Sequence, residues 1–168
     1  MSRIYLLRHA KAVQALPGMK DFDRPLDERG LETAAKLAAT LQANGMIPDK
    51  IIASPSLRTR QTLAPIAARL PFEIDTEYDR TLFDGPDGSY LSAIHRSGGA
   101  TSVMLVGHNP MTEEAAMLLC GSGDAEARRK LLHGFPTGAL AVIDLPSTLM
   151  DARRGAGSLV MFITDGSL

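Results

Sequence analysis

The sequence contains a single cysteine, Cys120, among its 168 residues. One cysteine excludes an internal disulfide framework and a cysteine-rich metal cluster. Cys120 follows the apolar run 117–119, and this context favours a buried thiol over a reactive one.

The sequence also lacks an excess of either charge. Eighteen basic residues stand against nineteen acidic ones, which gives a formal net charge of -1. A chain this close to neutral has no overall field that attracts nucleic acid or an anionic membrane surface, so we expect neither as a partner. Any anion-binding site therefore has to be local.

No stretch of the chain approaches the roughly 20 apolar residues that cross a bilayer. Near its start, Arg3 and Arg8 bracket too few apolar residues for the core of a secretory signal. We therefore expect a cytoplasmic protein. The composition, with 45% hydrophobic and 22% charged residues, is that of a globular protein, and the length suits a single domain over residues 1–168.

Strand and helix patterns alternate along the chain. Short, mainly apolar runs predict strands at 4–7, 50–53, 72–75 and 102–106. Apolar periodicity and capping residues predict helices at 28–43, 57–70, 89–96, 110–120 and 125–133. Turn residues predict loops at 14–27 and 82–88. Two further runs, 138–144 and 158–163, have no long helix between them and predict an antiparallel pair. The whole pattern is that of an α/β protein with a helix-flanked, mostly parallel sheet and an antiparallel portion.

Histidines and arginines stand at three places where a predicted strand ends or a helix begins. Arg8 and His9 follow the first strand, Arg58 lies in the first turn of the helix after the second strand, and His108 follows the strand 102–106. Because ligands of open α/β sheets bind beyond the carboxyl ends of the strands, these side chains could converge there. A cation in a first helical turn is disfavoured by the helix dipole, so we expect a negative group near Arg58.

Two arginines and two histidines together suggest phosphoryl transfer without a metal. Guanidinium groups match phosphate oxygens bidentately, and imidazole can act as a nucleophile. The two cations would repel a divalent ion, and no carboxylate stands at ligand spacing from the histidines. The other histidines, His95 and His133, have no motif around them and are interpreted as ordinary surface or helix residues, and the basic run 128–130 as a solvated face.

The segments around these residues resemble those of the histidine phosphatase superfamily, which includes the phosphoglycerate mutases. Residues 7–10, Leu-Arg-His-Ala, are similar to its Arg-His-Gly signature, residues 54–62 to its Ser-Pro-x-x-Arg-x-x-Gln-Thr segment, and residues 107–110 to its second-histidine turn. The short length and the segments 23–26 and 135–138 are similar to the SixA-type branch, whose members are phosphohistidine phosphatases. One departure is Ala10, which stands where the family usually has glycine.

The resemblance implies a three-layer α/β/α sandwich of the phosphoglycerate mutase-like type. It also implies that His9 is the nucleophile, that Arg8, Arg58 and His108 hold the phosphoryl group, and that neither a metal nor another cofactor is needed. Many members supply a carboxylic acid from the loop after the third strand. We expect Asp84 to be that acid, with Glu77 as the other candidate.

The expected activity is removal of a phosphoryl group through a phosphohistidine intermediate on the enzyme. The resemblance favours phosphohistidine on a protein as the substrate, carried for example by a phosphorelay domain. A phosphatase of small phosphate monoesters is the alternative within enzymes, and a mutase is less favoured. A module that binds phosphorylated partners without catalysis is the alternative from another class.

Overall fold

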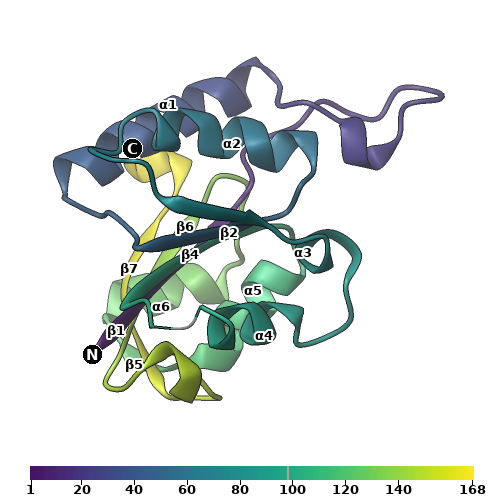
Figure 1. Ribbon diagram of the computed structural model, residues 1–168. Coiled ribbons are helices and arrows are strands. Elements are labelled where there is room, and N and C mark those ends of the chain that lie inside the picture. Colours follow the sequence, from purple (N-terminus) through teal and green to yellow (C-terminus); the bar gives the residue numbers. More distant parts are fainter. Residues whose placement is uncertain (98) are drawn as a thin grey trace.

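The computed structural model describes residues 1–97 and 99–168, which form a seven-stranded sheet covered by helices (Figure 1). The strands are β1 (Ser2–Arg8), β2 (Lys50–Ala53), β3 (Asp75–Tyr78), β4 (Ser102–Gly107), β5 (Cys120–Gly123), β6 (Leu140–Leu145) and β7 (Gly157–Ile163). The α-helices are α1 (Glu28–Ala43), α2 (Leu57–Ala67), α3 (Thr81–Asp84), α4 (Ser89–His95), α5 (Met111–Leu119) and α6 (Ala125–Leu132). Short 3-10 helices are η1 (Asp21–Asp23), η2 (Leu149–Asp151) and η3 (Asp165–Ser167).

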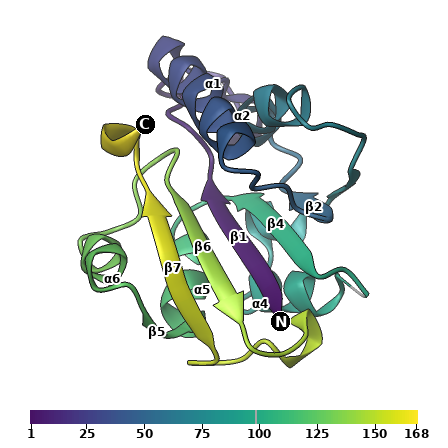
Figure 2. The same ribbon diagram turned by 90° about the vertical axis from the view of Figure 1, so that its left-hand side faces the viewer.

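The strands lie in the order β3-β2-β4-β1-β6-β7-β5, and Figure 2 shows β4, β1, β6 and β7 side by side. The pairs β3·β2, β2·β4, β4·β1 and β7·β5 are parallel. Among the described strands β6 alone runs against its neighbours, β1 and β7. The predicted mostly parallel sheet with an antiparallel portion is therefore confirmed, including the antiparallel pairing of the last two predicted strands.

Two apolar layers sandwich the sheet, because successive side chains of a strand point to opposite faces. On β1, Ile4 and Leu6 pack with the buried side chains of α4, α5 and α6. The alternate residues Tyr5 and Leu7 pack with those of α1 and α2 on the other face. Figure 1 shows these two helical layers on either side of the sheet. The three-layer α/β/α arrangement is confirmed.

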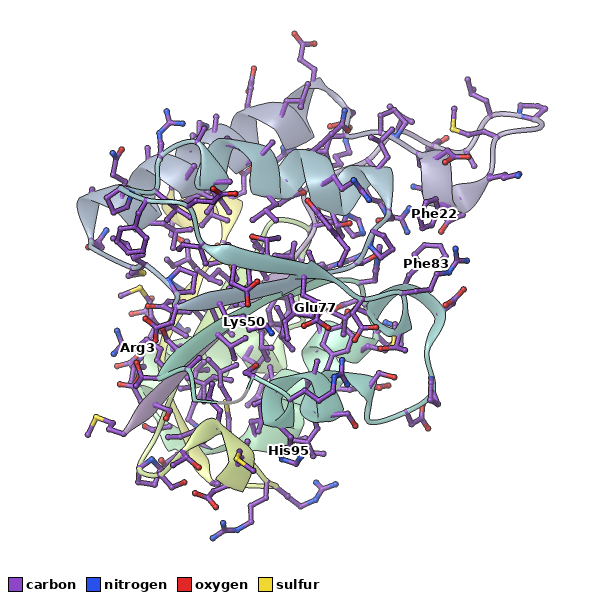
Figure 3. All side chains as sticks on the ribbon, viewed as in Figure 1. Arg3, Phe22, Lys50, Glu77, Phe83 and His95 are labelled. Atoms are coloured by element: carbon purple, nitrogen blue, oxygen red, sulfur yellow. The ribbon has the colours of Figure 1, made fainter. Side chains whose placement is uncertain are left out.

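The third strand is shifted from its predicted place. It spans residues 75–78, not 72–75, and it forms an edge of the sheet. Its register on β2 joins Lys50 to Asp75 and Ala53 to Tyr78, and Lys50 Nζ lies 3.0 Å from the Glu77 carboxylate (Figure 3). An edge strand is defined by pairing with one neighbour, so apolarity was a poor guide to its position.

Other departures occur where short elements form. Residues 82–84, predicted as part of a loop, lie in the one-turn helix α3, and β5 was not predicted. Helix α2 ends at Ala67, three residues before its predicted end. Cys120 is half-buried, and desolvation raises the pKa of its thiol to about 11, which keeps it protonated. Among the described residues no helix combines the length and apolarity that crossing a bilayer requires.

Candidate active site

The four residues singled out from the sequence follow strands whose carboxyl ends meet at one edge of the sheet. Arg8 and Gly107 are register partners at the ends of β1 and β4, and the His9 backbone N–H donates to the Gly107 carbonyl at 3.0 Å. The end of β2 joins the same edge, because Ser54 donates its backbone N–H to Val106 at 2.9 Å. The parallel register therefore brings the two histidines and the start of α2 together.

His9 is 8% exposed, and its hydrogen bonds define its tautomer. Arg58 Nε lies 3.3 Å from His9 Nε2, and a guanidinium can only donate, so Nε2 carries the lone pair. The proton is then on Nδ1, which donates to the Ala10 carbonyl at 2.7 Å. Burial, helped by the charges of Arg58 and Arg8, lowers the pKa of His9 to about 4. The ring is therefore neutral at neutral pH and presents Nε2 as a nucleophile.

His108 is 5% exposed and lies beside His9, with 5.1 Å between the ring centroids. Arg58 Nη2 donates to His108 Nδ1 at 3.2 Å, and His108 Nε2 donates to Ser54 Oγ at 2.8 Å. Burial and the proximity of His9 and Arg58 lower the pKa of His108 to about 3. One guanidinium thus bridges the unprotonated nitrogens of two neutral rings.

Arg58 is held in this position by Asp21, from the short helix η1. Arg58 Nη1 donates to the Asp21 carbonyl at 2.6 Å, and Nη2 lies 3.0 Å from its carboxylate. The expected negative group near the cation in the first turn of α2 is therefore present. The sequence placed Asp21 only within a loop bordering the strand end, and no periodicity marked it as a partner of Arg58.

Arg8 lies on the same edge and is half-buried. Its Nη1 donates to the Phe135 carbonyl at 2.8 Å, while its Nε is buried and has no hydrogen-bond partner among the described residues. Desolvation lowers its pKa, so the charge is held in a poorly solvated place. A buried guanidinium N–H without an acceptor is suited to an oxyanion of a ligand.

Two further side chains hold the backbone beside the histidines, and the sequence did not predict this role for either of them. Thr62 Oγ1 accepts from the Ala10 backbone N–H at 3.0 Å, and Tyr90 Oη accepts from the His108 backbone N–H at 2.8 Å. Thr62 belongs to the segment that resembles the family, whereas no signal pointed to Tyr90. The methyl group of Ala10 is fully buried in a small cluster with Leu26 and Ala34, so the departure from glycine is accommodated by packing.

Asp84 is not brought into this group. Its carboxylate is exposed and pairs with Arg80 at 2.9 Å, and no hydrogen bond joins it to the two histidines or to Arg8 and Arg58 among the described residues. The bond to Arg80 lowers the pKa of Asp84, which favours the ionised form, whereas a general acid must carry a proton. The role of Asp84 as the acid stays a prediction that this conformation does not support, and Glu77 is paired with Lys50.

The remaining histidines have local structural partners. His95 Nε2 lies 2.7 Å from the Ala152 carbonyl, and His133 Nδ1 lies 2.7 Å from the Arg129 carbonyl one helical turn earlier. Within residues 1–97 and 99–168, no group of three or more His, Cys, Asp or Glu side chains is arranged to hold a metal ion.

Known proteins share this fold and these segments. The family model of the histidine phosphatase superfamily (branch 1) matches residues 4–82. An uncharacterized protein of Mycobacterium tuberculosis is 34% identical over 160 residues, which cover 93% of this chain and 98% of that protein. The crystal structure of a candidate phosphohistidine phosphatase SixA from Agrobacterium tumefaciens is 36% identical, with a TM-score of 0.83 and 97% coverage of both chains.

The phosphohistidine phosphatase SixA of Escherichia coli is 28% identical over 122 residues, covering 70% of this chain and 74% of that protein. The similarity to the mycobacterial and Agrobacterium proteins extends over nearly the whole of each chain. The protein therefore belongs to the histidine phosphatase superfamily and resembles its SixA members.

Proposed function

We propose that the protein hydrolyses phosphohistidine on a partner protein through a phosphorylated His9. The observation that carries this proposal is the state of His9 Nε2, which is unprotonated, buried and 3.3 Å from the Nε of Arg58. A nucleophile and a phosphate-binding cation are thus adjacent, without a further group between them.

In the first step, Nε2 of His9 attacks phosphorus in line, and the bond from phosphorus to the leaving group breaks. Arg8 and Arg58 balance the charge on the phosphoryl oxygens, in the way that arginines stabilise other phosphoryl transfers. His9 keeps its proton on Nδ1, and the hydrogen bond to the Ala10 carbonyl stabilises the positive charge that the ring gains when Nε2 binds phosphorus. Water then attacks phosphorus, and the bond between phosphorus and His9 Nε2 breaks. The phosphate leaves with both protons of that water, as dihydrogen phosphate, and His9 returns to its neutral form with its proton on Nδ1.

A histidine leaving group fits the absence of a supported acid. A phosphohistidine ring that is protonated on its second nitrogen departs as neutral imidazole, and it requires no proton from the enzyme. An alkoxide leaving group requires one, and the ionised, exposed Asp84 is poorly suited to supply it. The similarity to SixA proteins supports the same substrate class.

The test uses a protein labelled with ³²P on histidine. The native enzyme should release labelled phosphate and carry a transient, acid-labile label, and His9→Asn should do neither while remaining folded. The matched control is His133→Asn, because His133 is exposed and contacts only its own helix in its side-chain hydrogen bond. Undiminished turnover by His9→Asn would show that His9 is not the nucleophile. A clear preference for small phosphate monoesters would show that phosphohistidine on a protein is not the main substrate.

A further inference from the structure

Two phenylalanines adjoin the site on the side of Arg58 and His108. Phe83, in α3, meets the His108 ring edge to face, with 5.3 Å between the centroids and an interplanar angle of 80°. The Arg58 guanidinium carbon lies 5.8 Å from the centroid of the same ring. Phe83 therefore lies beside two of the three residues proposed to hold the phosphoryl group.

The second ring comes from a segment far away in the sequence. Phe22, in η1, stands edge to face with Phe83 at 5.2 Å and 85°. Figure 3 shows Phe22 and Phe83 at the same end of the molecule, in η1 before α1 and in α3 after β3. Phe22 follows Asp21, which holds Arg58, so this ring is tied to the phosphoryl site through the backbone. We call Phe22 and Phe83 the aromatic wall.

Arg80 lies against both rings of the aromatic wall. Its guanidinium carbon lies 5.0 Å from the Phe22 centroid and 5.4 Å from that of Phe83, and its side chain is 62% exposed. The wall therefore contacts an exposed cation, Arg80, as well as the buried His108 and Arg58. Both phenylalanines are only half-buried, so part of each ring is available to a bound molecule.

We propose that the aromatic wall binds the leaving group of the substrate and selects groups with a flat, ring-shaped surface. This inference rests on the proposed function and names what that site recognises beyond phosphorus. A phenyl ring offers no hydrogen-bond donor or acceptor, so it distinguishes leaving groups by shape and by aromatic contact. The imidazole of phosphohistidine has such a surface, whereas ammonia and small alcohols do not.

The alternative is that the two rings merely fasten one loop to the other. In that case their loss would loosen Asp21 and α3 and slow every substrate equally. A wall that touches the leaving group predicts unequal effects, because only ring-bearing substrates lose a contact. The comparison therefore needs substrates that share the bond to phosphorus and differ in the leaving group.

Phosphohistidine and phosphoramidate form such a pair, since both are cleaved at a phosphorus–nitrogen bond and only the first releases a ring. Phe22→Leu and Phe83→Leu should each lower kcat/KM for phosphohistidine by roughly three- to tenfold, the range of a lost aromatic pair. For phosphoramidate the change should stay within about twofold, as expected where no ring contact is lost. Phe72→Leu is the matched control, because Phe72 is 62% exposed and precedes the edge strand β3.

The same variants are assayed on phenyl phosphate and glycerol phosphate, which repeats the comparison at a phosphorus–oxygen bond. If the enzyme prefers esters, the proposed substrate fails while the wall is still tested by this second pair. If these variants lose kcat/KM equally on both substrates of a pair, or lose none on the ring-bearing substrate, the aromatic wall does not bind the leaving group. Loss confined to the ring-bearing substrates supports it.

Discussion

Arg58 is joined to Asp21 twice, through the Asp21 carbonyl at 2.6 Å and through its carboxylate at 3.0 Å. These bonds engage Nη1 and Nη2 and leave Nε directed at His9. Asp21 also accepts from Arg24 at 2.7 Å, and the bonds from Arg24 and then Arg58 lower the pKa of the Asp21 carboxyl. The anion that orients Arg58 thus comes from a loop outside the sheet.

Replacement of Asp21 tests this orientation. Asp21→Ala should lower kcat/KM by about tenfold, in keeping with the roughly 1.5 kcal/mol of a hydrogen bond to a charged group. Asp21→Asn keeps an acceptor oxygen and should recover most of this loss in steady-state kinetics. Asp23→Ala, in the same short helix, is the control. If Asp21→Asn is as impaired as Asp21→Ala, the charge matters and the hydrogen bond does not.

Arg58→Lys should lower the activity far more than Asp21→Ala does, although lysine keeps the positive charge. Lysine cannot donate in a fixed fork to His9, His108 and Asp21 at once. We expect a fall in kcat of about 10² to 10³, as for removal of an oxyanion donor. Arg60→Lys on the same helix serves as the comparison, because Arg60 is exposed and stacks on Tyr78. Comparable kcat values for these two variants in steady-state assays would count against the assigned role of Arg58.

The low pKa values of His9 and His108 predict that acid destabilises the fold. An unfolded chain protonates these rings near pH 6.5, whereas the folded protein holds them neutral until about pH 4 and about pH 3. Between those values the unfolded state binds more protons, so the free energy of unfolding falls as pH drops below about 6.5. At pH 5 the loss should be on the order of 2 kcal/mol for each histidine.

Urea titrations at pH 7.5 and 5 measure this loss. His108→Asn should flatten the dependence on pH, while His133→Asn should leave it unchanged, since His133 is exposed. If the free energy of unfolding changes with pH equally in the native protein and in His108→Asn, the fold does not hold the His108 ring neutral.

Gly107 is required by the position of Tyr90. A Cβ at residue 107 would overlap the Tyr90 hydroxyl, the group that accepts from the His108 backbone N–H. Gly107→Ala should therefore destabilise the protein by about 1 to 3 kcal/mol, the usual cost of overpacking. Gly166→Ala, where no atom lies within 4 Å of an added Cβ, is the control in thermal unfolding.

The double variant Gly107→Ala/Tyr90→Phe separates the clash from other effects of the added methyl group. Removing the hydroxyl takes away the nearest clashing atom, although the ring carbon Cζ would still lie 2.7 Å from the added Cβ, and it leaves the His108 N–H without its acceptor. The double variant should thus be more stable than Gly107→Ala and less stable than the native protein. Additive losses in the two single variants would rule out the steric explanation.

The sequence alone determined most of the sheet, the helices that flank it, and the places of Arg8, His9, Arg58 and His108 at strand ends or at a helix start, but not β5 or the exact place of β3. Apolar runs such as 102–106 mark buried strands whatever their neighbours are, and the end of a parallel strand is a fixed place in the fold. Arg8, His9 and His108 could therefore be placed at one edge before any contact was known.

Only the tertiary structure decided what surrounds those residues. Asp21 reaches Arg58, and Phe22 reaches Phe83, because two loops without periodicity approach each other across the strand ends. In the same segment Asp84 pairs with Arg80, whereas its neighbour Phe83 borders His108. Loop conformation depends on contacts distant in the sequence, and no local pattern of residues encodes them.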